Sequence, residues 1–221
     1  MSFDLAAAAA LVGICAAGIV LTGVWLVIGR SLDRAVGVFA LQAALVGVVA
    51  LAVGVATGAA HLIVGGLLAI TVRAVIVPMV LRGILRESPV RRETEPYLGR
   101  RGSLLAAILI VFVGVAGGRE AGLAGSLGAP DALPAAIATV LLGLLLMTTR
   151  RKSVSIVIGL LVFDDGIALA ALSLTYGMPL VIELGIAFDL LILVVGVRVY
   201  ARRMLATFGS LSTDRLRNLR G

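Results

Sequence analysis

The chain has very little of what metal, redox and disulfide sites are built from. Its 221 residues include one cysteine, Cys15, and one histidine, His61. A single cysteine excludes an internal disulfide and the paired-cysteine spacings of zinc and iron–sulfur sites. With no second histidine and no cysteine beside it, His61 is expected to be structural or interfacial at the outer end of a span, with accessory proton handling as the alternative. We therefore expect no metal and no bound cofactor.

Charge is also scarce, and apolar sequence is abundant. Charged residues make up 14% of the chain and hydrophobic residues 61%, with a mean hydropathy of +1.15. The apolar runs are about 20 residues long, which matches the roughly 30 Å of hydrocarbon that a helix must cross. Strand-like alternation is absent, so neither a barrel nor a strand followed by a phosphate-binding glycine loop is predicted. The sequence predicts an all-α, polytopic integral membrane protein.

The apolar runs between charges predict seven spans. They cover residues 5–29, 35–57, 60–81, 103–118, 132–149, 153–175 and 180–201. No basic residue precedes the first run, so we expect it to stay uncleaved. The polar loop 86–101 separates a three-span part, 1–85, from a four-span part, 102–221, which ends in a basic tail at 204–221.

The basic residues predict an orientation. Most of the 19 lysines and arginines follow the first, third and fifth runs or lie in the C-terminal tail. Basic residues close to spans are retained on the cytoplasmic side, so we expect the N-terminus outside and the C-terminus inside. The net charge of +7 then reflects topology and contact with anionic lipid, and it does not indicate nucleic-acid binding.

Four charged residues interrupt the apolar runs near their centres: Arg73, Asp164, Asp165 and Asp189. At 1.5 Å rise per residue they fall at similar depth. Each would cost about 2.5–3.5 kcal/mol if it faced lipid, so the group is expected to face protein, water or its own members as a midplane polar layer. Glu183 precedes Asp189 by about 9 Å of helix. It is either an outward branch of that layer or an interfacial residue.

The chemistry of the layer points to protons. Asp164 and Asp165 are about 100° apart on one helix and can face one groove, where repulsion between ionised carboxylates favours a proton on one of them. Arg73 stays charged, so it suits the role of a charge modulator. Pro78 removes a backbone donor, which predicts a kink with bound water beside Arg73. Static ion pairs that fix helix register, and recognition of another subunit, are the alternatives.

Several short motifs resemble one known family. They are the pairs and runs IG at 158–159, FDDG at 163–166, IELGIAFD at 182–189, LSTDRL at 211–216 and LRG at 219–221, together with ITVR at 70–73 before Pro78. These motifs and the seven-span layout resemble the membrane component E of hydrogenase-4 and of related membrane-bound hydrogenase or formate hydrogenlyase complexes. The match is strongest over residues 150–221. The family's span-three lysine appears here as Arg73, and its span-six acid and amide appear as Asp164 and Asp165.

Residues 131–203 also resemble the K-type subunit of respiratory complex I and its counterpart in multisubunit sodium/proton antiporters. In that relative, acids on two successive helices belong to a hydrophilic axis; the second matches Asp189 well, and the first matches Asp164 or Asp165 loosely. The resemblances imply a multi-pass subunit in the cytoplasmic membrane of a prokaryote. Its neighbours would be antiporter-like subunits and the membrane anchor of a nickel–iron hydrogenase module.

The function expected from these resemblances is coupling of redox chemistry to movement of protons or sodium ions, without a catalytic or redox centre in this chain. Asp165 and Asp189 are the preferred relay residues, Asp164 their coupled partner, Glu183 an outward relay and Arg73 the modulator. Two other classes stay open. A free-standing transporter of a small solute would use paired broken helices, but Pro78 is the one mid-span proline and Gln42 the main intramembrane amide. A purely structural scaffold is the third class.

Overall fold

The computed structural model describes residues 5–87, 99–120 and 132–175. Within them, six helical stretches are long and apolar enough to cross a membrane. The elements are α1 (Leu5–Ile28), α2 (Leu32–Thr57), α3 (Ala60–Ala69), the π-helix η1 (Ile70–Ile76), α4 (Val77–Glu87), α5 (Arg100–Glu120), α6 (Ala132–Thr149) and α7 (Ser153–Thr175). The predicted all-α class and the first six predicted spans are confirmed, with α3, η1 and α4 forming one stretch. The seventh predicted span, 180–201, most of the loop 86–101 and the basic tail lie outside the described residues.

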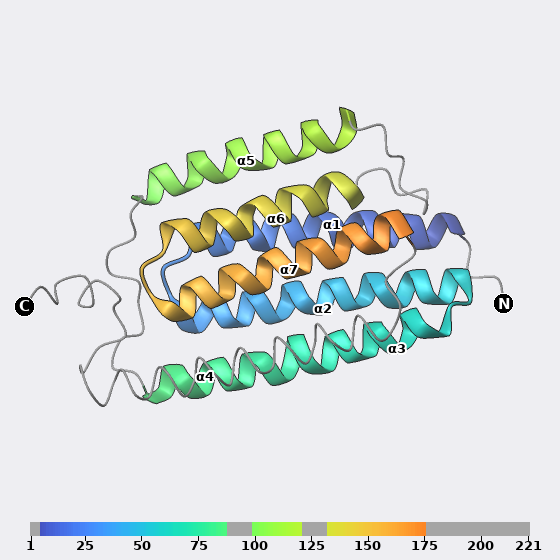
Figure 1. Ribbon diagram of the computed structural model, residues 1–221, viewed down its shortest axis with the longest axis horizontal. Coiled ribbons are helices and arrows are strands. Elements are labelled where there is room, and N and C mark those ends of the chain that lie inside the picture. Colours follow the sequence, from blue (N-terminus) through green and yellow to red (C-terminus); the bar gives the residue numbers. More distant parts are fainter. Residues whose placement is uncertain (1–4, 88–98, 121–131, 176–221) are drawn as a thin grey trace, which may run out of the picture.

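Four helices form a ring at the centre of the molecule (Figure 1). Going round the ring, α1 packs on α2, α2 on α7, α7 on α6 and α6 on α1. The stretch α3–η1–α4 lies along the outside of α2, and α5 lies on the opposite side against α6 and α1. The ring therefore has an interior that lipid does not reach, and the two outer stretches flank it.

Short connections make sequence neighbours antiparallel. The turn between α2 and α3 depends on Gly58, whose φ of 69° is left-handed and whose backbone N–H bonds to the carbonyl of Gly54. Glycine adopts this conformation without the penalty that a Cβ would bring, and it is a common helix terminator. The chain thus reverses at Gly58 and lays α3 back along α2.

Glycines bring the backbones of α6 and α7 into close contact. A Cβ at Gly143 would lie 2.5 Å from the backbone nitrogen of Phe163, and a Cβ at Gly166 would lie 2.7 Å from the backbone nitrogen of Val140. Small residues at such crossings let membrane helices pack through their backbones. Because Phe163 and Gly166 flank the paired aspartates, this contact also fixes the height and rotation of Asp164 and Asp165.

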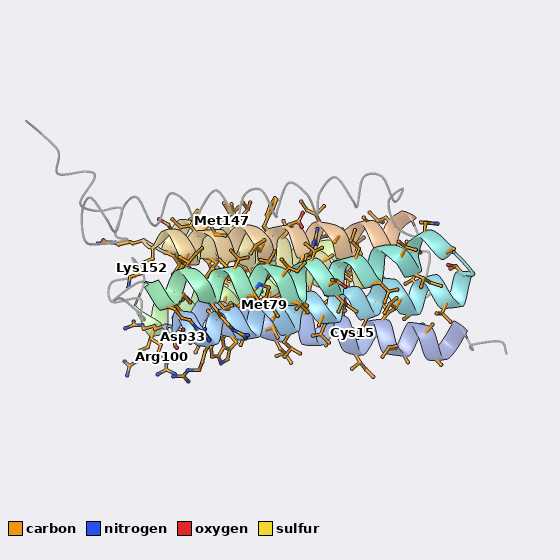
Figure 2. The ribbon with its side chains drawn as sticks, turned by 90° about the horizontal axis from the view of Figure 1, so that it is seen from below. Cys15, Asp33, Met79, Arg100, Met147 and Lys152 are labelled. Atoms are coloured by element: carbon orange, nitrogen blue, oxygen red, sulfur yellow. The ribbon has the colours of Figure 1, made fainter. Side chains whose placement is uncertain are left out.

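Arg150 ties the α6–α7 connection to the end of α1. Its Nη2 lies 3.2 Å, 2.5 Å and 2.7 Å from the carbonyl oxygens of Leu26, Val27 and Gly29 and donates to them. The carbonyls of Leu26 and Val27 belong to the last turn of α1, where carbonyls lack a helical amide to accept from, and Gly29 follows the helix end. Figure 2 shows Asp33, Arg100 and Lys152 gathered at this same end of the bundle. The predicted orientation would make it the cytoplasmic end.

Two hydrophobic clusters fill the bundle at different heights. The lower cluster, nearer the Arg150 end, includes Phe39, Leu81, Leu142, Leu161 and Val162; the upper cluster includes Ile19, Val46, Val49, Leu62 and Leu169. Near the boundary between the two clusters, α2, α6 and α7 each carry polar side chains: Gln42, Thr139 and the paired aspartates. A polar layer therefore lies at the boundary between two apolar regions.

Candidate functional site

Three charged side chains meet in this polar layer. The guanidinium of Arg73 donates from Nη1 to Oδ1 of Asp165 at 3.2 Å, and its Nη2 lies 2.5 Å from Oδ2 of Asp164. Arg73 comes from η1 outside the ring, and both aspartates come from α7. The predicted meeting of Arg73, Asp164 and Asp165 at one depth is confirmed by these contacts.

The three groups differ in their exposure. The side chain of Asp165 is 1% exposed, that of Arg73 is 9% exposed and that of Asp164 is 18% exposed. Asp165 lies on the buried stripe of α7 with Leu161, Val162 and Leu169, at the three- and four-residue spacing of one helix face. Asp165 is therefore the inner carboxylate of the ring, and Asp164 is the outer one.

The backbone around Arg73 is unusual. Residues 70–76 form a π-helix, in which the amide of Val77 bonds to the carbonyl of Val72 five residues earlier. Pro78 follows at once and has no N–H, so it offers no amide bond to the preceding turn. The structure describes a widened helical turn beside Arg73, whereas the kink with bound water expected there stays a prediction. Single π turns inside α-helices are frequent at functional sites.

The cluster is not balanced in charge. One guanidinium faces two carboxylates, and among the described residues Oδ2 of Asp165 is buried without a hydrogen-bond donor. The contact between Asp164 and Nη2 is an ion pair without hydrogen-bond geometry. A buried carboxylate oxygen without a hydrogen-bond donor costs free energy, and binding a proton at that oxygen would remove its negative charge.

Other predicted site residues are not in the cluster or are not described. His61 is exposed and precedes Arg73 by twelve residues, about 18 Å along the helix, so it lies outside the layer. Asp189 and Glu183 lie outside the described residues. Within residues 5–87, 99–120 and 132–175, His, Cys, Asp and Glu side chains form no group of metal-ligand size.

Sequence reasoning gave Gln42 no role at the site. Its side chain is fully buried, and its Oε1 accepts a 3.3 Å hydrogen bond from the Thr22 hydroxyl of α1. Its Nε2 is buried without an acceptor in the described part of the chain. The available signal was a glutamine in the middle of the apolar helix α2, but sequence alone does not show which side of α2 faces the ring.

Two groups of relatives were found among known proteins. The chain is 35% identical over 216 residues to Uncharacterized protein Rv0085 of Mycobacterium tuberculosis (strain ATCC 25618 / H37Rv), covering 95% of this chain and 96% of that one. It is 24% identical over 201 residues to Hydrogenase-4 component E of Escherichia coli (strain K12), covering 91% and 93%, and equally similar to the protein of that name in Shigella flexneri. No family model and no solved structure matches.

These similarities extend over nearly the whole chain, so they include the α3–η1–α4 stretch as well as α7. The proposed likeness to the complex I K-type subunit stays a prediction. The chain belongs to the family of the mycobacterial protein Rv0085, and hydrogenase-4 component E is its distant homologue.

Proposed function

We propose that this chain is a membrane subunit of a complex I-like, membrane-bound hydrogenase assembly and that its Arg73–Asp164–Asp165 cluster takes part in proton translocation. The distant homology to a hydrogenase-4 component, spread over most of the chain, supports the assembly. The partners would be antiporter-like subunits and the membrane anchor of the hydrogenase module. The chain would lie in the cytoplasmic membrane of a prokaryote, with the Arg150 end of the bundle on the cytoplasmic side.

The observation that carries the proton role is the charge imbalance. The buried carboxylate of Asp165 and the partly buried carboxylate of Asp164 share one guanidinium, and a buried charge without a counterion is expensive in a membrane interior. Taking up a proton at Oδ2 of Asp165 forms an O–H bond and leaves one carboxylate opposite one guanidinium. Releasing the proton restores the ionised pair. A charge change in a neighbouring subunit would shift the balance between these two states.

The same geometry favours protons over sodium ions. A cation next to Asp165 would lie within reach of the Arg73 guanidinium and would be repelled by it. A proton avoids this repulsion because it becomes part of a neutral carboxyl group. Arg73 itself stays protonated, so it biases the carboxylates and does not carry the proton. Asp189 and Glu183 are proposed to continue the path, with His61 as an accessory group.

The test is proton uptake driven by the redox reaction, in proteoliposomes that contain the purified assembly. Native protein is compared with Asp165→Asn, Asp164→Asn and Asp189→Asn at equal subunit content. Asp33→Asn is the matched control, because Asp33 is exposed in the first turn of α2 at one end of the bundle. We expect Asp165→Asn to lower the number of protons moved per electron at least tenfold, and Asp33→Asn to leave it unchanged.

Two outcomes would overturn the proposal. An unchanged proton-to-electron ratio in an intact Asp165→Asn assembly would make the cluster a static ion pair and the chain a scaffold. Purification of the chain from its native membrane without any hydrogenase-type or antiporter-like subunit would favour the free-standing transporter instead.

A further inference from the structure

Two buried polar atoms of the ring interior have complementary chemistry. Nε2 of Gln42 is a donor without an acceptor, and Oδ2 of Asp165 is an acceptor without a donor, in the described part of the chain. The Gln42 residue is 0% exposed and Asp165 is 1% exposed. Buried polar groups in folded proteins are nearly always hydrogen-bonded, so each of these two atoms calls for a partner.

Both side chains face the ring interior. On α2, Gln42 belongs to the buried stripe that contains Phe39, Val46 and Val49, and α2 packs directly on α7. On α7, Asp165 lies on the stripe that contains Leu161, Val162 and Leu169. Residues at three- and four-residue spacing share one helix face. The two stripes belong to the same two hydrophobic clusters, so they face the same interior.

The heights of the two residues also agree. On α2, Gly47 packs against Gly66 and Ile70 of the antiparallel stretch α3–η1. Three residues beyond Ile70, Arg73 is then level with about residue 44 of α2, which places Gln42 about 3 Å from the height of Arg73. Arg73 in turn contacts Asp165 at 3.2 Å. Gln42 and Asp165 therefore belong to one layer.

Thr22 sets the orientation of the amide. Its one hydroxyl hydrogen is shared among Oε1 of Gln42 at 3.3 Å and the carbonyl oxygens of Gly18 and Ile19 at 3.0 Å and 2.8 Å. An amide whose oxygen is held toward α1 has its nitrogen turned away from that contact. The other ring neighbour of α2 is α7, which carries Asp165.

We propose that Gln42 is a positioning residue for Asp165 and that its amide N–H donates to one bound water, which in turn donates to Oδ2 of Asp165. The polar layer then runs from Arg73 through Asp165 and Gln42 to Thr22, across the whole ring. Gln42 cannot take up a proton, so its role is to hold the inner carboxylate in place; a carboxylate oxygen has two lone pairs, so Oδ2 can accept this hydrogen bond and still take up a proton. Its effect on proton movement rests on the proposed function, whereas the contact itself does not.

A double-mutant cycle tests the contact without any transport measurement. The thermal midpoint of the purified assembly is measured for native protein, Gln42→Met, Asp165→Asn and the double variant. Methionine keeps the approximate length and volume of glutamine and removes the donor. We expect the combined shift of the midpoint to differ from the sum of the single shifts by about 2 °C or more, because residues in contact are not additive.

The matched control is the cycle of Gln42→Met with Thr57→Val. Thr57 lies on the same helix, fifteen residues away, and bonds to the carbonyl of Val53. We expect that cycle to be additive. If the Gln42–Asp165 cycle is equally additive, the proposal is wrong.

A spectroscopic measurement covers the case in which the variants lower stability too much for a cycle. The infrared difference between native protein and Asp165→Asn isolates the carboxyl band of Asp165, and Gln42→Met is expected to shift that band. An unchanged band would overturn the contact. An unchanged proton-to-electron ratio in Asp165→Asn, with a positive cycle, would instead remove the proposed function and leave the contact standing.

Discussion

Helices α5 and α7 have similar lengths, 21 and 23 residues, but opposite relations to the bundle. The most apolar stretch of α7 is 56% buried, whereas that of α5 is 22% buried. The large side chains Leu105, Leu109 and Phe112 of α5 are mostly exposed. On α7, by contrast, the polar Asp165 is among the most buried residues.

The difference shows how interior and exterior are distinguished in a bilayer. Lipid tails are as apolar as leucine, so an apolar side chain has no preference for the protein interior over lipid. Polar groups and glycines mark the interior instead, because polar groups need partners and glycines permit backbone contact. On α5 the contact with the ring is a narrow stripe at Gly114 and Gly118, where an added Cβ would lie 2.6 Å from Ala138 and Pro134 of α6.

The largest expected effect comes from removing Arg73, the cation that contacts Asp164 and Asp165 of α7. Arg73→Leu leaves Asp164 and Asp165 without their counterion, and breaking a buried pair in this way costs about 3–5 kcal/mol. We expect a loss of unfolding free energy of about this size, measured by reversible unfolding in bicelles. Arg73→Lys should retain part of the stability, because the charge remains while the fork-shaped contact is lost.

A charge-matched variant sharpens this prediction. Adding Asp164→Asn and Asp165→Asn to Arg73→Leu removes the uncompensated carboxylates, so most of the lost stability should return. If Arg73→Leu alone is as stable as the native chain, Arg73 does not stabilise the buried carboxylates of α7. The contrast between α7 and α5 would then rest on the glycine contacts and not on charge.

A smaller effect is expected from the glycine contact that holds α7 on α6. In Gly143→Ala the new methyl group would meet backbone atoms of Phe163 and Gly159, which cannot rotate away. Overpacking of this kind typically costs about 1–3 kcal/mol. The same unfolding assay should show the loss. The matched control is Gly117→Ala on α5, where an added Cβ meets nothing within 4 Å and where helix propensity favours alanine. A loss at Gly117→Ala as large as that at Gly143→Ala would mean that the close approach to α7 is not the cause.

Much of the fold could be predicted from the sequence, because spans follow from local composition. The first six predicted spans match the helices to within a few residues. The largest difference is at the end of the third span, where the helix continues beyond the predicted end at residue 81 to Glu87. The depth of Arg73, Asp164 and Asp165 followed from counting residues at 1.5 Å each. These properties depend on one helix at a time.

The remaining features depend on which helices are neighbours. The ring of α1, α2, α7 and α6 is a set of pairings between segments far apart in the chain, and periodicity within one span does not encode it. The buried position of Gln42 follows from that ring. The π-helix at Arg73 was predicted as a kink because Pro78 removes an amide bond, but a missing bond alone does not say whether the chain will bend or widen.

The smallest expected effect is on the outer face of α5. Phe112 is 70% exposed, so its ring contacts lipid both in the folded bundle and in a helix separated from it. Truncation in Phe112→Ala therefore removes few protein contacts, and we expect a change of less than about 0.5 kcal/mol in the free energy of unfolding in the same assay.

The matched variant is Phe39→Ala on α2. The Phe39 side chain is 0% exposed in the lower cluster, and its removal should cost about 3–5 kcal/mol. If Phe112→Ala lowers the stability of the assembled complex nearly as much as Phe39→Ala does, but leaves the isolated chain unchanged, the outer face of α5 contacts another subunit. If Phe112→Ala leaves the stability of both unchanged, that face contacts lipid, and the contrast between α5 and α7 holds within the assembly as well.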